Sequence, residues 1–164
     1  PAHTRRQREQ AAAEGLRSIY TPQLVMDGRD SRDYEAVLQR RPGPPGARIT
    51  MELAAADRVV AMVDPAAGVG AWEASWNVTE DGHRSKVTAG ENSGERLLHD
   101  FVVRQYVPVG RYRGAARLEL AVVPATAHLR RVNLVVTDAR SRKPLQALSL
   151  GCSVPTQGAS TRPG

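Results

Sequence analysis

The sequence predicts an α+β protein, in which a helix-strand-helix segment is followed by an antiparallel β-sandwich of about eight strands. Two observations support this fold class. Apolar residues in the first 41 positions recur with the spacing of a helix, whereas those from residue 47 onward alternate with polar residues, as in half-buried strands. Between the two patterns, residues 42–46 have the sequence Pro-Gly-Pro-Pro-Gly, which can neither continue a helix nor enter the interior of a sheet.

The first segment is predicted to begin with a helix and a short strand. Residues 4–14 are good helix formers, with Thr4 positioned to cap the helix and Gly15 positioned to end it. Residues 23–26 form a short apolar strand, which the turn pair Asp27-Gly28 closes.

A second helix is predicted over residues 31–41. Residues 29–33 lead directly into it, without a second strand. Three apolar residues fall on one face of this helix: Tyr34, Val37 and Leu38. The whole segment is expected to be less stable than the sandwich, or to lean on it, because a partial sheet leaves an open edge.

The chain is expected to divide at the stretch rich in proline and glycine. The expected units are the C-terminal part of a domain over residues 1–41, a stiff linker over 42–46, the β-sandwich over 47–152 and a disordered tail over 153–164.

About eight short strands are expected in the sandwich. They cover residues 49–53, 59–63, 72–78, 84–88, 96–107, 115–123, 131–137 and 145–150. Asp81-Gly82 is expected to form a hairpin turn between the third and the fourth of them. Short alternating strands joined by glycine, aspartate and proline turns are typical of a sandwich or an open barrel.

The net charge of the chain is +6, and its calculated pI is about 10.2. All but two of its 23 basic residues are arginines, and they are scattered through every segment instead of forming one stripe. Most of the aromatic residues lie among strand residues, where core packing explains them. The composition therefore indicates a solvated basic surface and does not favour nucleic acid as a partner. No run of about 18 or more apolar residues occurs, so no membrane span is predicted.

Cys152 is the single cysteine. The chain therefore holds no internal disulfide, no Cys-x-x-Cys pair and no cysteine-rich zinc site, and no cofactor is expected. Cys152 is expected to be a small, half-buried residue at the end of the last strand. Two histidines, His83 and His128, flank predicted turns, and no zinc-binding or catalytic-triad pattern accompanies them.

Thr21 and Pro22 form the first candidate binding site. In thioredoxin-like folds, a cis-proline preceded by a small residue presents a backbone edge to a peptide substrate. The alternative is a proline that simply begins a strand, since proline has no N–H to donate to a sheet ladder.

Residues 90–99 form the second candidate site. Four polar side chains of this glycine-containing loop could bind an anion, a cation or a sugar: Glu91, Asn92, Arg96 and His99. Two of them, a carboxylate and an imidazole, are too few to hold a metal. The alternative is a tight turn between strands, with Asn92 or Gly94 at positive φ.

Two stretches of the sequence, taken together, resemble a known family. Residues 15–29 (GLRSIYTPQLVMDGR) and 90–104 (GENSGERLLHDFVVR) are similar to motifs of an uncharacterised bacterial family, domain of unknown function 1223. The resemblance covers the chain up to about Leu150. It implies a thioredoxin-like N-terminal half, a β-rich C-terminal half and a secreted or periplasmic location.

The resemblance also extends to individual positions. It implies that Thr21 and Pro22 match the cis-proline strand, and that the four polar residues of the 90–99 loop match the signature of the second half. The cysteine-bearing loop of the family belongs upstream of Pro1, and the family has a second hairpin strand after Gly28 that this sequence is expected to lack.

The expected function follows from these comparisons of residues. The chain is expected to be a fragment of a secreted or periplasmic thioredoxin-like protein, without the redox cysteines and without catalysis of its own. The alternative is a β-sandwich binding module for a protein, glycan or metal partner, and a protein or peptide is the partner that both hypotheses allow.

Overall fold

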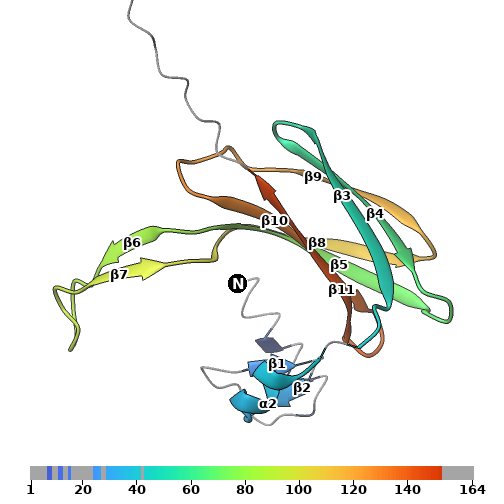
Figure 1. The fold of residues 1–164 in the computed structure, drawn as a ribbon, viewed down its shortest axis with the longest axis horizontal. Helices are drawn as coiled ribbons and strands as arrows, with labels where there is room; N and C mark the ends of the chain where they lie inside the picture. The colour runs from blue at the N-terminus through green and yellow to red at the C-terminus, as the bar shows by residue number, and fades with distance from the viewer. Residues whose placement is uncertain are drawn as a thin grey trace, which may run out of the picture.

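The structure, a computed structural model, describes residues 7, 8, 11, 12, 15, 24–26, 29–41 and 43–152. Strands make up 59% of this part of the chain and helix 8%, so the protein is mostly β (Figure 1). The predicted α+β class is therefore wrong, because the alternating pattern downstream of the linker outweighs the short helical pattern before it. Several predicted features lie outside the described residues: Thr21, Pro22, the Asp27-Gly28 turn, Pro42 and the tail over 153–164.

The first segment contains a β-hairpin, and not the predicted helix-strand-helix arrangement of a thioredoxin-like domain. Strand β1 (Leu24–Met26) pairs antiparallel with β2 (Arg29–Ser31). The expectation that residues 29–33 lead directly into a helix is therefore wrong. Within the predicted first helix, the described residues are helical: Gln7, Arg8, Ala11 and Ala12.

Helix α2 (Tyr34–Gln39) is shorter than predicted and packs weakly. It begins after β2, where the Asp33 carboxylate accepts a hydrogen bond from the Ala36 backbone N–H at 2.9 Å. None of its residues is buried, and Leu38 is 85% exposed. The apolar face predicted for this helix therefore contributes little burial.

Two antiparallel sheets form the main body (Figure 1). The smaller sheet has the strand order β3-β4-β9 and is made of β3 (Ala47–Ala55), β4 (Arg58–Pro65) and β9 (Ala116–Ala121). The larger sheet has the order β11-β10-β5-β8 and is made of β5 (Ala71–Glu80), β8 (Val102–Arg113), β10 (Arg130–Asp138) and β11 (Pro144–Cys152). A further pair, β6 (His83–Lys86) and β7 (Arg96–His99), extends away from both sheets.

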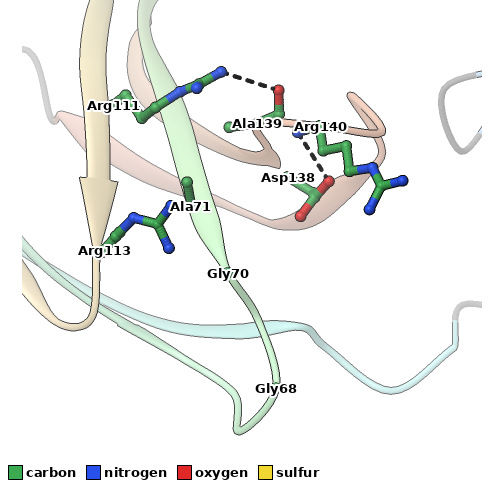
Figure 2. Close-up of a pocket in the computed structure, with 8 residues that line it drawn as sticks. All are labelled: Gly68, Gly70, Ala71, Arg111, Arg113, Asp138, Ala139 and Arg140. Carbon is green, nitrogen blue, oxygen red and sulfur yellow. Dashed lines mark hydrogen bonds between the residues drawn. The ribbon is translucent and has the colours of Figure 1, made fainter.

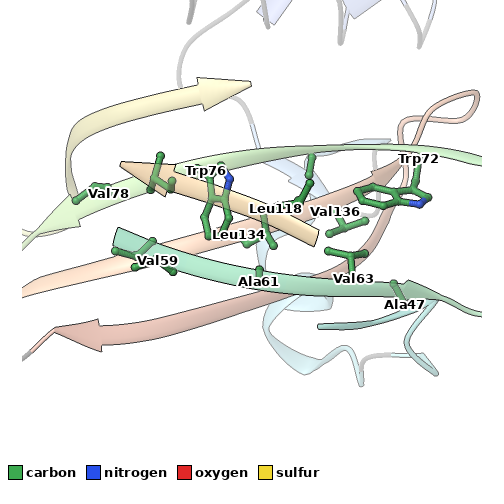
Figure 3. Packing of buried hydrophobic residues seen from close by; sticks show 13 residues of the cluster. Ala47, Val59, Ala61, Val63, Trp72, Trp76, Val78, Leu118, Leu134 and Val136 are labelled. Atoms are coloured by element: carbon green, nitrogen blue, oxygen red, sulfur yellow. The ribbon is translucent and has the colours of Figure 1, made fainter. Parts of the chain in front are cut away.

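The apolar faces of the two sheets pack against each other and form the core (Figure 3). The larger sheet contributes Trp72, Ala74, Trp76, Val78, Val132, Leu134 and Val136. The smaller sheet contributes Ala47, Val59, Ala61, Val63, Leu118 and Leu120. Within each strand these residues are two positions apart, because successive side chains of a strand point to opposite faces of the sheet. Cys152 is partly buried against this core.

The strand predicted over residues 96–107 is divided in the structure. It breaks at Asp100 and Phe101, where Phe101 adopts a φ of 55°, and β7 and β8 lie on either side of the break. The Asp81-Gly82 turn also differs from the prediction, because β6 pairs with β7 and not with β5. The described residues 43–152 therefore contain nine strands, and two of them form a separate ribbon.

The two tryptophans of the core differ in their hydrogen bonding. Trp72 Nε1 donates to the Gly114 carbonyl at 2.9 Å, and its ring stacks on Tyr112 with the centroids 4.9 Å apart. Trp76 Nε1 is buried and has no hydrogen-bond partner within the described residues. Because an unpaired buried N–H is costly, the two indole groups stabilise the fold to different extents.

We expect Trp72→Phe to lower the free energy of unfolding by about 1–2 kcal/mol more than Trp76→Phe does. The first change leaves the Gly114 carbonyl without its donor, whereas the second removes an N–H that has no acceptor. Both remove the same volume, so each variant serves as the control for the other. Urea unfolding gives the two values, and equal losses would contradict this difference in pairing.

Candidate functional site

Four of the six predicted site residues lie on one projecting element. We call this element the ribbon: strands β6 and β7 with the loop between them, residues 83–99 (Figure 1). Glu91 and Asn92 lie in the loop, Arg96 begins β7 and His99 ends it. The structure therefore places these four residues along the ribbon from its loop to its base, instead of around one pocket.

The loop of the ribbon is closed by its own backbone. The Gly94 N–H donates to the Val87 carbonyl, and the Val87 N–H donates to the Glu95 carbonyl, each at 2.9 Å. Gly94 has a φ of 99°, a conformation that favours glycine. Within the described residues, no group of three or more His, Cys, Asp or Glu side chains is placed to hold a metal ion.

Two aspartates fix the point where the ribbon leaves the larger sheet. The Asp100 Oδ1 accepts a hydrogen bond from the Gly82 N–H at 2.8 Å, and the Asp81 Oδ1 accepts one from the Phe101 N–H at 2.9 Å. Each carboxylate thus binds the backbone of the opposite strand. The other oxygen of Asp81 accepts from Arg131 Nη1 at 2.7 Å. The two bends are therefore held together by reciprocal side-chain bonds.

Glu80, the last residue of β5, is fully buried beside these bends. Its cross-strand partner Arg130 donates to Oε1 from Nη2 at 2.6 Å and from Nε at 3.2 Å. The other oxygen, Oε2, lies 2.9 Å from His83 Nε2 and 3.4 Å from Arg104 Nε. Both oxygens of this carboxylate are therefore paired. We call Glu80, His83, Arg104 and Arg130 the base cluster.

Arg130 also connects the base cluster to the segment before β10. Its Nη1 donates to the Val123 carbonyl and its Nη2 to the Pro124 carbonyl, each at 2.7 Å. The residue is only 7% exposed, so these bonds replace the hydration that the guanidinium loses on burial. One side chain thus ties β5, β10 and the β9–β10 connection together.

The pKa of Glu80 is lowered from 4.5 to about 2. Burial alone would raise it, because desolvation disfavours the carboxylate, but the hydrogen bonds from Arg130, Thr126 and His83 outweigh burial. An ionised carboxylate only accepts hydrogen bonds, so His83 Nε2 carries the shared proton. A carboxyl group with so low a pKa is a poor general acid or base near neutral pH. The base cluster therefore has the properties of a structural clamp.

Two histidines that lie far apart in the sequence meet at this base. The rings of His83 and His128 stack with their centroids 3.8 Å apart and their planes 17° apart. His128 Nδ1 donates to the Asp81 carbonyl at 3.1 Å. The sequence predicts two separate turns for these histidines, because nothing in their spacing shows that the two turns adjoin.

Glu80 and Arg130 carry a signal that the sequence analysis missed. In β5 the inward positions are 72, 74, 76 and 78, and the next one in phase is Glu80. In β10 the inward positions are 132, 134 and 136, and the one in phase before them is Arg130. A negative charge thus continues the inward-facing positions of one strand, and a positive charge continues those of the other. If the two strands are neighbours, this pattern predicts a buried ion pair.

One face of the ribbon is strongly basic. Cross-strand partners share a face, and Lys86 is the partner of Arg96, while Arg84 is the partner of Leu98. We call these four exposed residues the basic face. Within the described residues, no carboxylate lies within ion-pair distance of its three cations. Like charges directly opposite each other are unfavourable, so an anionic partner would stabilise this face.

The opposite face of the ribbon carries a serine and a histidine in contact. Ser85 Oγ lies 2.6 Å from His99 Nε2. A nucleophile and a base at this distance are part of a catalytic arrangement, but a third group must orient the base. Within the described residues no carboxylate bonds to His99, and the hydrogen bond is exposed to solvent. The pair is therefore explained as a cross-strand contact that steadies the ribbon.

The family model described as Protein of unknown function (DUF1223) matches residues 1–137. The chain belongs to this family. No curated protein and no solved structure matches it. In this DUF1223 chain the matched region includes the ribbon and all of the base cluster, and it ends one residue before the end of β10. Within the described residues, no helix is long and apolar enough to cross a membrane.

Proposed function

We propose that the protein is a binding module whose ribbon takes up an extended, acidic segment of a partner protein. The observation that carries the proposal is the basic face, where Lys86 and Arg96 stand opposite each other and, within the described residues, no carboxylate lies within ion-pair distance of either. Acidic side chains of a partner would relieve this repulsion. Leu98, which is 64% exposed on the same face, would supply an apolar contact beside the three cations.

The backbone of the ribbon supports the same proposal. In the described part of the chain, β6 and β7 form a sheet of two strands, so each has an outer edge of backbone N–H and C=O groups without a neighbouring strand. An extended peptide can add to such an edge through main-chain hydrogen bonds, while its side chains provide specificity. The base cluster and the paired aspartates hold the ribbon in place, which lowers the entropic cost of binding.

Photo-cross-linking tests this proposal in the full-length protein in its own host. A cross-linking residue replaces Leu98, and in the control it replaces Met62, which is exposed on β4 of the smaller sheet. We expect a defined protein adduct from position 98 and none from position 62. Cell fractionation of the same samples tests the secreted or periplasmic location, which we also propose on the basis of the sequence resemblance.

The second part of the cross-linking experiment reverses the charges of the basic face. We expect Arg84→Glu, Lys86→Glu and Arg96→Glu together to reduce the adduct at least about tenfold, since three ion pairs become repulsive. Mass spectrometry of the adduct should identify an acidic segment. Equal adducts from positions 62 and 98, or an adduct that charge reversal leaves intact, would exclude the ribbon as the binding element. An adduct that nuclease removes would assign nucleic acid instead and overturn the protein-binding proposal.

A further inference from the structure

A second feature lies at the opposite end of β5 from the ribbon. A hollow of about 570 Å³ opens where β5 begins, between the β4–β5 connection, the end of β8 and the β10–β11 turn (Figure 2). It is lined by Gly68, Gly70, Ala71, Arg111, Arg113, Asp138, Ala139 and Arg140. Three of these eight residues are arginines, and this volume is typical of a site for a small molecule.

One arginine of the hollow makes long contacts with two neighbouring residues. Arg111 Nη2 lies 3.4 Å from Glu73 Oε1 and donates to the Ala139 carbonyl at 3.4 Å. The other oxygen of Glu73 accepts from Arg142 Nη1 at 2.6 Å. Glu73 is thus shared between two guanidinium groups. The charge of Arg111 is therefore only partly neutralised.

The other two arginines add positive charge to the hollow, and Arg140 interacts electrostatically with Asp138. Within the described residues, no carboxylate lies within ion-pair distance of Arg113 or Arg140. Asp138 is the one acidic residue of the lining, and its Oδ1 already accepts hydrogen bonds from the Arg140 N–H and from the N–H and hydroxyl of Ser141. Those donors are neutral, so Asp138 keeps its charge and offsets one of the three positive charges of the lining, which leaves an excess of positive charge in the hollow.

The two glycines of the lining leave the hollow open. A side chain built on Gly70 would meet no atom within 4 Å, and Gly70 does not have a positive φ. The backbone at this position therefore tolerates other residues, and a larger side chain would occupy the hollow. In Figure 2, the side chains of Arg111 and Arg113 extend from β8 in the direction of β5, and Arg140 stands on the β10–β11 turn.

We propose that this hollow binds a small, multiply charged anion that carries phosphate or carboxylate groups. Guanidinium groups bind such groups through two parallel hydrogen bonds, and a hollow with three arginines in its lining suits an anion with at least two charges. This site is separate from the ribbon, and its proposed ligand is a small anion and not a protein segment. Its presence does not depend on the function proposed for the ribbon.

Isothermal titration of the full chain with pyrophosphate and with citrate, at low ionic strength, tests the proposal. We expect at least one of the two anions to bind, and Arg113→Gln to weaken that binding about tenfold, because it removes a charge-assisted contact. Gly70→Val should also weaken binding, because its side chain takes up part of the hollow without changing the charge. The control is Arg58→Gln on the smaller sheet, where Arg58 pairs with Glu119 at 3.3 Å, and it should leave binding unchanged.

The two anions separate the two ligand chemistries. Binding of pyrophosphate alone assigns phosphate groups to the natural ligand, and binding of citrate alone assigns carboxylates. Binding of both shows that the site selects its ligand by charge and not by the type of acidic group. Binding that Arg113→Gln and Arg58→Gln weaken equally would show a general charge effect and overturn the proposal, as would no binding of either anion. Thermal unfolding of each variant confirms that it is folded.

Discussion

Glu80→Ala is expected to lower the free energy of unfolding by about 3–5 kcal/mol, the cost of leaving one partner of a buried ion pair without the other. Glu80 is fully buried, and its carboxylate pairs with Arg130, His83 and Arg104. The alanine variant leaves the buried guanidinium of Arg130 without its carboxylate. Urea unfolding at neutral pH measures the loss.

A double-mutant cycle separates the pair from the cavity that alanine creates. Replacing the pair by apolar residues, in the variant Glu80→Leu/Arg130→Met, should cost at least about 1 kcal/mol less than the two single changes added together. Neither residue is then left charged and alone. Costs that simply add would show that the two side chains act independently, and the role assigned to the base cluster would be wrong.

Stability is expected to fall by about 3 kcal/mol as the pH drops from about 4.5 to about 2, through Glu80 alone. The pKa of this group is depressed in the folded state, from 4.5 to about 2. Its contribution is therefore complete above the unfolded pKa and is lost as the pH falls through the folded one. In this window the unfolded chain binds a proton that the folded chain does not. Urea midpoints across the acid range measure the loss.

Glu80→Gln is the control for this pH dependence, because glutamine keeps the shape and does not titrate. The variant should be less stable at neutral pH and should lose less stability on acidification. Some acid sensitivity will remain, since the hydrogen bonds from Ser141 also lower the pKa of Asp138. Parallel curves for the variant and the wild type would show that Glu80 does not dominate the acid response.

The two-sheet core could be read from the sequence to a large extent, because its signal is local. Trp72, Trp76 and Val78 alternate with polar residues, and this spacing alone puts them on one face of a strand. The first segment was predicted poorly, since Tyr34, Val37 and Leu38 have the spacing of a packed helix but form a short one that is mostly exposed. Apolar spacing predicts a face that could be buried, and tertiary contacts decide whether it is.

The candidate site was harder to predict, because its parts come from distant positions. The ribbon residues Glu91, Asn92, Arg96 and His99 were found because they lie in one short stretch. Glu80 and Arg130 were missed because their meeting depends on β5 lying next to β10, a pairing that no local pattern specifies. The bend at Phe101 was missed for a related reason, since the Asp81 carboxylate that binds its N–H is contributed by another strand.

The crossed aspartate bonds at the root of the ribbon also restrict the movement of its two strands relative to each other. Asp81 holds the strand that returns from the ribbon, and Asp100 holds the strand that leaves for it. Neither strand can move at this point without straining its bond to the other. Because Glu80 is the immediate neighbour of Asp81, we expect a displacement of the root of the ribbon to disturb the buried ion pair as well.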